Sequence, residues 1–272
     1  MKLLVYGAGV IGCLYAALFS DAGHHVCIYA RGQRLEILKK NGLVYSNDFI
    51  FLPVRENQVY IALRELKNNC SPNIVTMVNT LEPYSNWEEI CGKGRIAPAF
   101  PGAGGSFDEN VLHAALTPRL IQKTTFAEIS GEKTERLLKL ASLFKQANIP
   151  YQIVQDMHAW QLSHLAMVVP IADAYYMADN PEKAGYDGKV MLYTAKQMQR
   201  NFSALHKLGI ELSPPKMNFF RLAPVSILSM GLSFVFRSKF GNMFMYQHSM
   251  KAPDEMRQLH EQFYRYIKSS LA

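Results

Sequence analysis

KLLVYGAGVIG, residues 2–12, is the stretch that decides the fold of this chain. An apolar run over residues 2–6 leads directly into a glycine-rich loop and then into a helix-compatible segment. This order is typical of a dinucleotide-binding site. The glycines permit a tight turn, close backbone approach to a pyrophosphate and close helix packing, and the helix N-terminus presents N–H groups to phosphates. The predicted cofactor-binding residues of the loop are Gly7, Ala8, Gly9, Val10, Ile11 and Gly12.

The residue that follows the second predicted strand selects the cofactor. Residues 24–29 read as this strand, and a carboxylate for the ribose 2′-hydroxyl is expected about 20 residues beyond the last glycine. Ala30 and Arg31 stand there instead. Because a guanidinium can bind a phosphate with two N–H groups, Arg31 predicts NADP(H) rather than NAD(H).

Three other interpretations of the N-terminal segment stay open. It could be a secretion signal, an ordinary glycine-rich turn without a ligand, or a membrane anchor. The three glycines weaken a signal-peptide helix, and they interrupt the run of about 20 apolar residues that a membrane span requires. We therefore expect a cytoplasmic, nucleotide-binding protein with no membrane partner.

Composition favours a globular protein of two domains. The chain has 272 residues, 49% of them hydrophobic and 19% charged, which suffices for a core at a length where chains begin to divide. The net charge of +7 suits phosphate-bearing ligands. The basic residues form no run or recognition motif, so no nucleic acid partner is predicted. The four cysteines lack metal-ligand spacing, so no metal site is expected.

Strand-like and helix-like patterns alternate through the first half of the chain. This alternation predicts an α/β fold, a Rossmann-type doubly wound, mostly parallel sheet with helices on both faces. After the first two strands, further strands are predicted at residues 49–54, 73–78, 95–100, 119–127 and 151–154, and helices at 35–40, 57–67 and 132–147.

The strands stop near residue 155, and the rest of the chain reads as helical. Helices are predicted over residues 157–177, 189–208 and 253–270, and residues 222–236 read as a core helix rather than a membrane span. We therefore expect an NADP-binding domain at 1–154 and an all-helical domain at 155–272. The second is expected to serve substrate binding and dimerisation, with a homodimer as the predicted assembly.

The order of motifs resembles the ketopantoate reductases (2-dehydropantoate 2-reductases) over nearly the whole chain. The resemblance rests on GAGVIG at residues 7–12, on ARG at 30–32, on VRENQ at 54–58, on VNT at 78–80, on FAE at 126–128 and on Trp160. It is more specific in the N-terminal half. Between residues 43 and 47 the chain is shorter than the corresponding segment of the family's proteins.

The resemblance implies NADPH-dependent reduction of a 2-oxo acid, with a small carbonyl compound as substrate. In the family, hydride passes to the keto carbon while a lysine polarises the oxygen and supplies the proton. By the matched motifs, Arg55 and Gln58 are expected along the cofactor. Asn79 is expected near the nicotinamide ribose or the substrate, and Glu255 is expected to contact substrate hydroxyls.

The chain departs from the family pattern on the helix that Trp160 opens. The family places a lysine and two asparagines there, on one helix face. The matching positions hold Leu162, Ala166 and Pro170, which are all apolar. A leucine cannot polarise a carbonyl, so the usual source of the proton is missing.

Four residues are candidates to replace the lysine. His248 can donate a proton near neutral pH. His164 lies two residues after Leu162, about 200° around a regular helix and so on another face, and a packing role is an equal alternative for it. Asp173, three turns beyond Leu162, returns to the same helix face. Lys216 is the weakest of the four.

A second glycine-rich segment, FPGAGG at residues 100–105, follows a predicted strand. Such glycines suit either anion binding by backbone N–H groups or a flexible loop, and the sequence favours neither.

Two classes of function therefore remain. One is a reductase with His164, His248, Glu255 and Asn79 as its catalytic candidates. The other is a non-catalytic NADP(H)-binding sensor or partner protein on the same fold.

Overall fold

The structure, a computed structural model, describes residues 1–30, 48–69, 71–108 and 111–271. It divides into two compact units, Met1–Met157 and His158–Ala272. Arg31 and the helix predicted at 35–40 lie outside the described residues.

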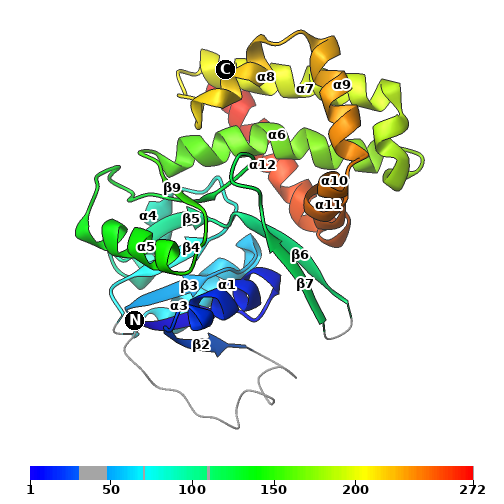
Figure 1. The fold of residues 1–272 in the computed structure, drawn as a ribbon. Coiled ribbons are helices and arrows are strands. Elements are labelled where there is room, and N and C mark those ends of the chain that lie inside the picture. Colours follow the sequence, from blue (N-terminus) through cyan, green and yellow to red (C-terminus); the bar gives the residue numbers. More distant parts are fainter. Residues whose placement is uncertain (31–47, 70, 109–110, 272) are drawn as a thin grey trace. The chain divides into compact units, whose positions relative to one another are not determined.

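Unit 1 is built on a mostly parallel sheet, which has seven strands within the described residues and the order β2-β1-β3-β4-β5-β8-β9 (Figure 1). All its pairs are parallel except β5 with β8. The chain leaves β1 for β2 on one side and resumes at β3 on the other, so the strand order reverses beside β1. Ligands of open α/β sheets bind at such a reversal. The strands are β1 Lys2–Tyr6, β2 His25–Tyr29, β3 Phe49–Leu52, β4 Ile74–Met77, β5 Ile96–Phe100, β8 Thr124–Phe126 and β9 Tyr151–Ile153.

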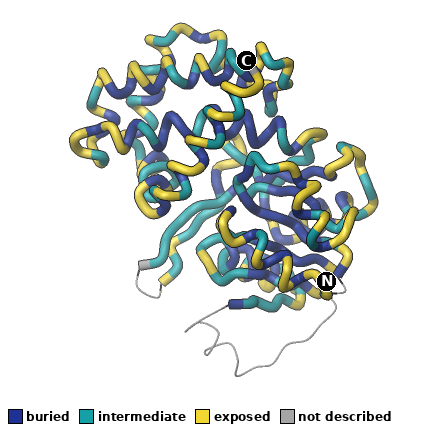
Figure 2. The backbone as a smooth tube through the Cα atoms, turned by 180° about the vertical axis from the view of Figure 1, so that it is seen from behind, coloured by how far each residue is buried: buried dark blue, intermediate teal, exposed yellow. Residues whose placement is uncertain are grey.

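The core of unit 1 is aromatic and lies between the sheet and two helices. Phe19 of α1 (Val10–Asp21) and Phe144 of α5 (Glu135–Gln146) pack on Phe51 at centroid distances of 4.9 and 6.0 Å. The central strands β3 and β4 are buried along their full length (Figure 2). Helices α3 (Glu56–Leu66) and α4 (Tyr84–Cys91) pack against each other. The α/β prediction is confirmed.

Residues 100–127 correct two sequence-based interpretations. FPGAGG is neither an anion-binding loop nor a flexible one, because Ala103–Asp108 forms strand β6 of a hairpin with β7, Val111–Leu116. A Cβ on Gly102 would stand 2.4 Å from the backbone nitrogen of Thr124, and a Cβ on Gly105 would stand 2.2 Å from the carbonyl oxygen of His113. These glycines therefore serve close backbone packing. The strand predicted at 119–127 shrinks to β8, because residues 118–122 form a turn.

Unit 2 is helical throughout its described residues, as predicted. The long helices are α6 Met157–Met177, α7 Gly188–Lys207, α9 Val225–Phe236 and α12 Pro253–Leu271. Shorter segments connect them: η2 Pro181–Tyr186, η3 Pro215–Met217, α8 Asn218–Leu222, α10 Lys239–Gly241, η4 Asn242–Tyr246 and α11 Gln247–Lys251. One hydrophobic cluster of this unit joins Tyr175, Met198 and Phe236. Among the described helices, none alone is long and apolar enough to cross a bilayer.

Candidate functional site

The glycine loop takes the conformation that the sequence predicts. Gly7 follows β1 with a φ of +124°, a value that L side chains rarely adopt, and its N–H donates to the carbonyl of Tyr29 at 2.9 Å. Gly9 is the N-cap of α1 and offers no side-chain cap. The first turn of α1 holds no acidic residue, so no carboxylate of this turn competes with a ligand for the helix N-terminus.

The three loop glycines meet different surroundings. A Cβ on Gly12 would stand 1.9 Å from the carbonyl oxygen of Gly7, so only glycine lets α1 approach the strand this closely. A Cβ on Gly9 would meet nothing within 4 Å. The need for glycine at position 12 thus lies inside the fold, whereas the space beside Gly9 is open to a ligand.

A pocket of about 250 Å³ opens at this loop. It lies where β1, β2 and β3 end, the edge at which open parallel sheets bind ligands. The predicted residues Gly7, Ala8 and Gln58 belong to its wall, together with others that the sequence did not single out. The full lining is Tyr6, Gly7, Ala8, Tyr29, Ala30, Val54, Gln58 and Ile61.

Two tyrosines form one wall of the pocket, and sequence reasoning missed them. The rings of Tyr6 and Tyr29, the last residues of β1 and β2, stack with centroids 4.5 Å apart. The Tyr6 hydroxyl donates to the carboxylate of Glu65 on α3. A tyrosine that ends each of two adjacent strands is the signal that could have revealed this wall.

The start of α3 carries the other two predicted cofactor residues of this edge. Arg55 is the N-cap of α3, and its carbonyl accepts the N–H of Gln58 at 2.9 Å. Both side chains are exposed. The adjacent Glu56 is instead buried and accepts a hydrogen bond from the hydroxyl of Thr80 at 2.7 Å. This bond ties the start of α3 to the loop that follows β4.

Asn79 lies in that loop, just beyond the carboxyl end of β4. Its side-chain Oδ1 is buried and has no hydrogen-bond partner among the described residues. A buried amide oxygen without a donor is costly, and in native structures such an atom calls for an explanation. A ligand that donates a hydrogen bond here would remove the cost.

The two candidate histidines lie in unit 2, on α6 and α11. His164 is buried, and its ring stacks on Trp160 with centroids 5.2 Å apart. Burial, and to a smaller extent the charge of His248, lower the pKa of His164 to about 3. The two imidazoles are therefore within electrostatic range of each other. His248 is exposed, whereas His164 is neutral near pH 7.

The remaining predicted residues of unit 2 fall into two groups. Glu255 stands in the first turn of α12 and is half-buried. Leu162, Ala166 and Pro170 on α6 are all buried, so they belong to the packed part of the helix.

Asp173 makes a hydrogen bond that the sequence did not reveal. Both of its carboxylate oxygens lie within 3.0 Å of Nδ1 of His260 on α12. Burial raises the pKa of Asp173, and His260 opposes that shift. The pair links two helices that are distant in sequence.

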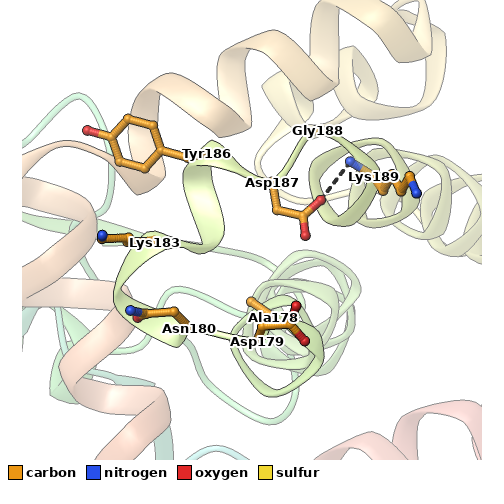
Figure 3. A pocket seen from close by; sticks show the side chains of 8 residues that line it. All are labelled: Ala178, Asp179, Asn180, Lys183, Tyr186, Asp187, Gly188 and Lys189. Carbon is orange, nitrogen blue, oxygen red and sulfur yellow. Dashed lines mark hydrogen bonds between the residues drawn. The ribbon is translucent and has the colours of Figure 1, made fainter.

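A second hollow, of about 710 Å³, lies in unit 2 between the end of α6 and the start of α7 (Figure 3). Asp187 is one of the residues that line this hollow. Its carboxylate accepts hydrogen bonds from the backbone N–H groups of Lys189 and Val190, and so caps the N-terminus of α7. This residue is thus engaged in helix capping. Among the described residues, no cluster of His, Cys, Asp or Glu could hold a metal ion.

Comparison with known sequences finds a family model that matches the N-terminal part of the chain. Residues 3–48 match the family model described as ketopantoate reductase PanE/ApbA. A curated relative, 2-dehydropantoate 2-reductase of Aquifex aeolicus, is 24% identical over 184 residues. That alignment covers 59% of this chain and 57% of the relative.

Solved structures resemble the whole chain. A PanE/ApbA family ketopantoate reductase from Ralstonia eutropha has a TM-score of 0.63 with 16% identity and covers 100% of both chains. D-mandelate dehydrogenase with NADH gives a TM-score of 0.62 with 13% identity, over 99% of each chain. The dimeric ketopantoate reductase of Staphylococcus aureus gives 0.63 with 10% identity, over 99% of this chain and 100% of that one. At these identities the likeness establishes the fold.

Proposed function

We propose that this chain belongs to the ketopantoate reductase family and is an NADPH-dependent reductase that converts a 2-oxo acid or a related small carbonyl compound to the hydroxy product. The observation that carries the proposal is the glycine loop at the carboxyl ends of β1, β2 and β3, which opens onto a pocket. In our proposal residues 1–154 bind the cofactor, and residues 155–272 bind the substrate and the second copy of a homodimer.

The residues of unit 1 fit a dinucleotide. The open space beside Gly9 and the uncapped N-terminus of α1 suit a pyrophosphate. The tyrosine wall of Tyr6 and Tyr29 suits the adenosine end. The orphaned Oδ1 of Asn79 suits a hydroxyl donor at the nicotinamide end. Arg55 and Gln58 are assigned to the stretch between these ends.

Arg31 carries the preference for NADP(H) in this proposal. Its place in the sequence is the one where a carboxylate would favour NAD(H), and a guanidinium favours a 2′-phosphate. D-mandelate dehydrogenase, whose structure was solved with NADH, has a similar fold. The fold therefore leaves the choice to individual side chains at this position.

The chemistry needs a hydride, which the nicotinamide would supply, and a proton, which the protein must supply. We assign the proton to His248. His248 is exposed. The buried His164 has a pKa of about 3, so its imidazole is neutral near pH 7 and is not the acid that supplies the proton. His164 would then act as a neutral hydrogen-bond donor, and Glu255 would bind the substrate hydroxyls.

One observation favours the alternative of a non-catalytic NADP(H)-binding sensor. The positions that match the family's lysine and asparagines hold the buried, apolar residues Leu162, Ala166 and Pro170. A protein that binds cofactor without turning it over has no need of polar groups there.

A turnover assay separates the two functions. NADPH oxidation is followed with a panel of 2-oxo acids, for the wild type and for His248→Ala, Glu255→Ala and a surface control, His206→Ala. The reductase proposal expects turnover, a loss of about 100-fold or more for His248→Ala, and no change for the control. Binding of NADPH without turnover on any member of the panel would favour the sensor.

A further inference from the structure

The positive charge of this chain is concentrated in one part of unit 2. Residues 188–253 contain nine Lys and Arg residues and a single acidic residue, Glu211. This segment alone is thus more positive than the whole chain, whose net charge is +7. Eight of the nine basic side chains are exposed. Such charge asymmetry indicates a polyanionic partner.

The same segment exposes large apolar side chains on one helix face. Ile227, Met230 and Phe234 of α9 are spaced three and four residues apart, so they form one stripe. Met230 is 70% exposed and Phe234 is 72% exposed. The opposite face of α9 is buried in the unit core through Leu228, Leu232 and Phe236.

A sharp bend extends this apolar surface beyond α9. The segment Pro215–Leu222 meets α9 at an angle of 115°, and Leu222, at the corner, is 68% exposed. By length and composition alone, the two segments together match a bent pair of helices that enters a bilayer. Figure 1 shows α8 and α9 as successive helices of unit 2. Beyond α9, the guanidinium of Arg237 lies 5.2 Å from the ring centre of the exposed Tyr186.

Basic residues flank the apolar surface at both of its ends. Lys216 precedes α8, and Arg237 and Lys239 follow α9. Apolar side chains framed by Lys and Arg are typical of helices that lie in a membrane interface, and aromatic rings gather at the same depth. Anionic headgroups attract each nearby cation by about 1 kcal/mol.

Two other occupants fit this surface less well. A symmetric second copy would bring the same patch face to face with itself, so its flanking cations would approach like charges. A nucleic acid would satisfy the cations but would leave Leu222, Met230 and Phe234 without an apolar counterpart.

We propose that α8, α9 and their flanking basic residues form a peripheral docking surface for an anionic lipid bilayer. The helices lie in the headgroup region and do not span the membrane. This surface departs from the sequence-based expectation of no membrane partner. It does not depend on the proposed reductase function, because none of the residues assigned there to the cofactor, the proton or the substrate belongs to this surface.

Vesicle flotation of the full chain tests this proposal. The probes are phosphatidylcholine vesicles with and without phosphatidylglycerol. The apolar variant is Leu222→Ser/Met230→Ser/Phe234→Ser, and the charge variant is Lys216→Glu/Lys239→Glu. The control variants change exposed residues of the same kinds in unit 1, Leu120→Ser/Leu138→Ser and Lys93→Glu/Lys133→Glu. NADPH binding and the melting temperature verify that each variant is folded.

The wild type is expected to float with the anionic vesicles only, and less as salt rises. Each docking variant should lower the bound fraction by about tenfold or more, while the controls bind as the wild type does. Three results would overturn the proposal: no binding by the folded wild type, binding that the docking variants retain, or a dimer in light scattering that the apolar variant dissociates without any vesicle binding. Binding to duplex DNA that depends on the basic residues alone would do the same.

Discussion

The carbonyl oxygen of Gly7 lies 1.9 Å from the place that a Cβ on Gly12 would take. This closeness fixes how α1 leaves β1, and it sets the direction of the helix N-terminus at the pocket. Gly9, between the two, faces open space instead. In this loop, Gly12 is therefore required for the packing of α1 on β1, whereas Gly9 leaves space in which a ligand can bind.

Alanine at the two positions should act differently. Gly12→Ala forces α1 away from the strand and should lower the free energy of unfolding by about 2 kcal/mol or more. Gly9→Ala meets no protein atom and its φ of −79° suits alanine, so stability should be unchanged while NADPH binding weakens. Urea unfolding and calorimetric titration measure the two effects. Equal stability of the two variants would contradict this account.

Glu128 should prove to be a structural residue. Its buried carboxylate accepts hydrogen bonds from Thr134 and from Nε of Arg136 at 3.0 Å, and Arg136 also donates to the carbonyl of Gly94. Removing one partner of a buried ion pair leaves the other charge uncompensated. Glu128→Ala should therefore lower the free energy of unfolding by about 3 to 5 kcal/mol.

The surface ion pair of Glu135 and Lys139 provides the control for Glu128. Both side chains are mostly exposed, so Glu135→Ala should cost less than about 1 kcal/mol. If both variants lose the same small amount in urea unfolding, the Glu128 pair does not stabilise the fold as we describe.

His164 should make stability depend on pH. Its folded pKa, about 3, lies below the unfolded value of 6.5. Between these values the unfolded state binds a proton that the folded state does not, so stability falls as pH drops from 6.5 toward 3. The loss at the acid end should reach at most about 5 kcal/mol.

His164→Gln should flatten this acid limb, because glutamine does not titrate. The exposed His206→Gln serves as the matched variant and should retain the wild-type slope. Urea unfolding at pH 7 and at pH 4.5 measures it. An unchanged slope in His164→Gln would mean that the buried imidazole is not the source.

The sequence predicted unit 1 well because its signals are local. A glycine loop between a strand and a helix needs only adjacent residues, and the apolar runs of β3 and β4 mark buried parallel strands. The hairpin of β6 and β7 was missed because its glycines, Gly102 and Gly105, are explained only by backbone contacts with Thr124 and His113.

The candidate site was predictable only in part, for a similar reason. Gln58 was found from its motif, whereas the pairing of Tyr6 with Tyr29 and that of Glu56 with Thr80 join residues from different elements. The burial that holds His164 neutral is also a property of the folded unit. Such relationships depend on tertiary packing, which no short stretch of sequence carries.

Calorimetric titration with NADPH and NADH tests the central claim most directly. A guanidinium on the 2′-phosphate contributes about 1.5 to 3 kcal/mol, so the wild type should bind NADPH about 10- to 100-fold more tightly than NADH. Arg31→Ala should remove that difference and leave NADH affinity unchanged. Equal affinities in the wild type, or tighter binding of NADH, would contradict the account.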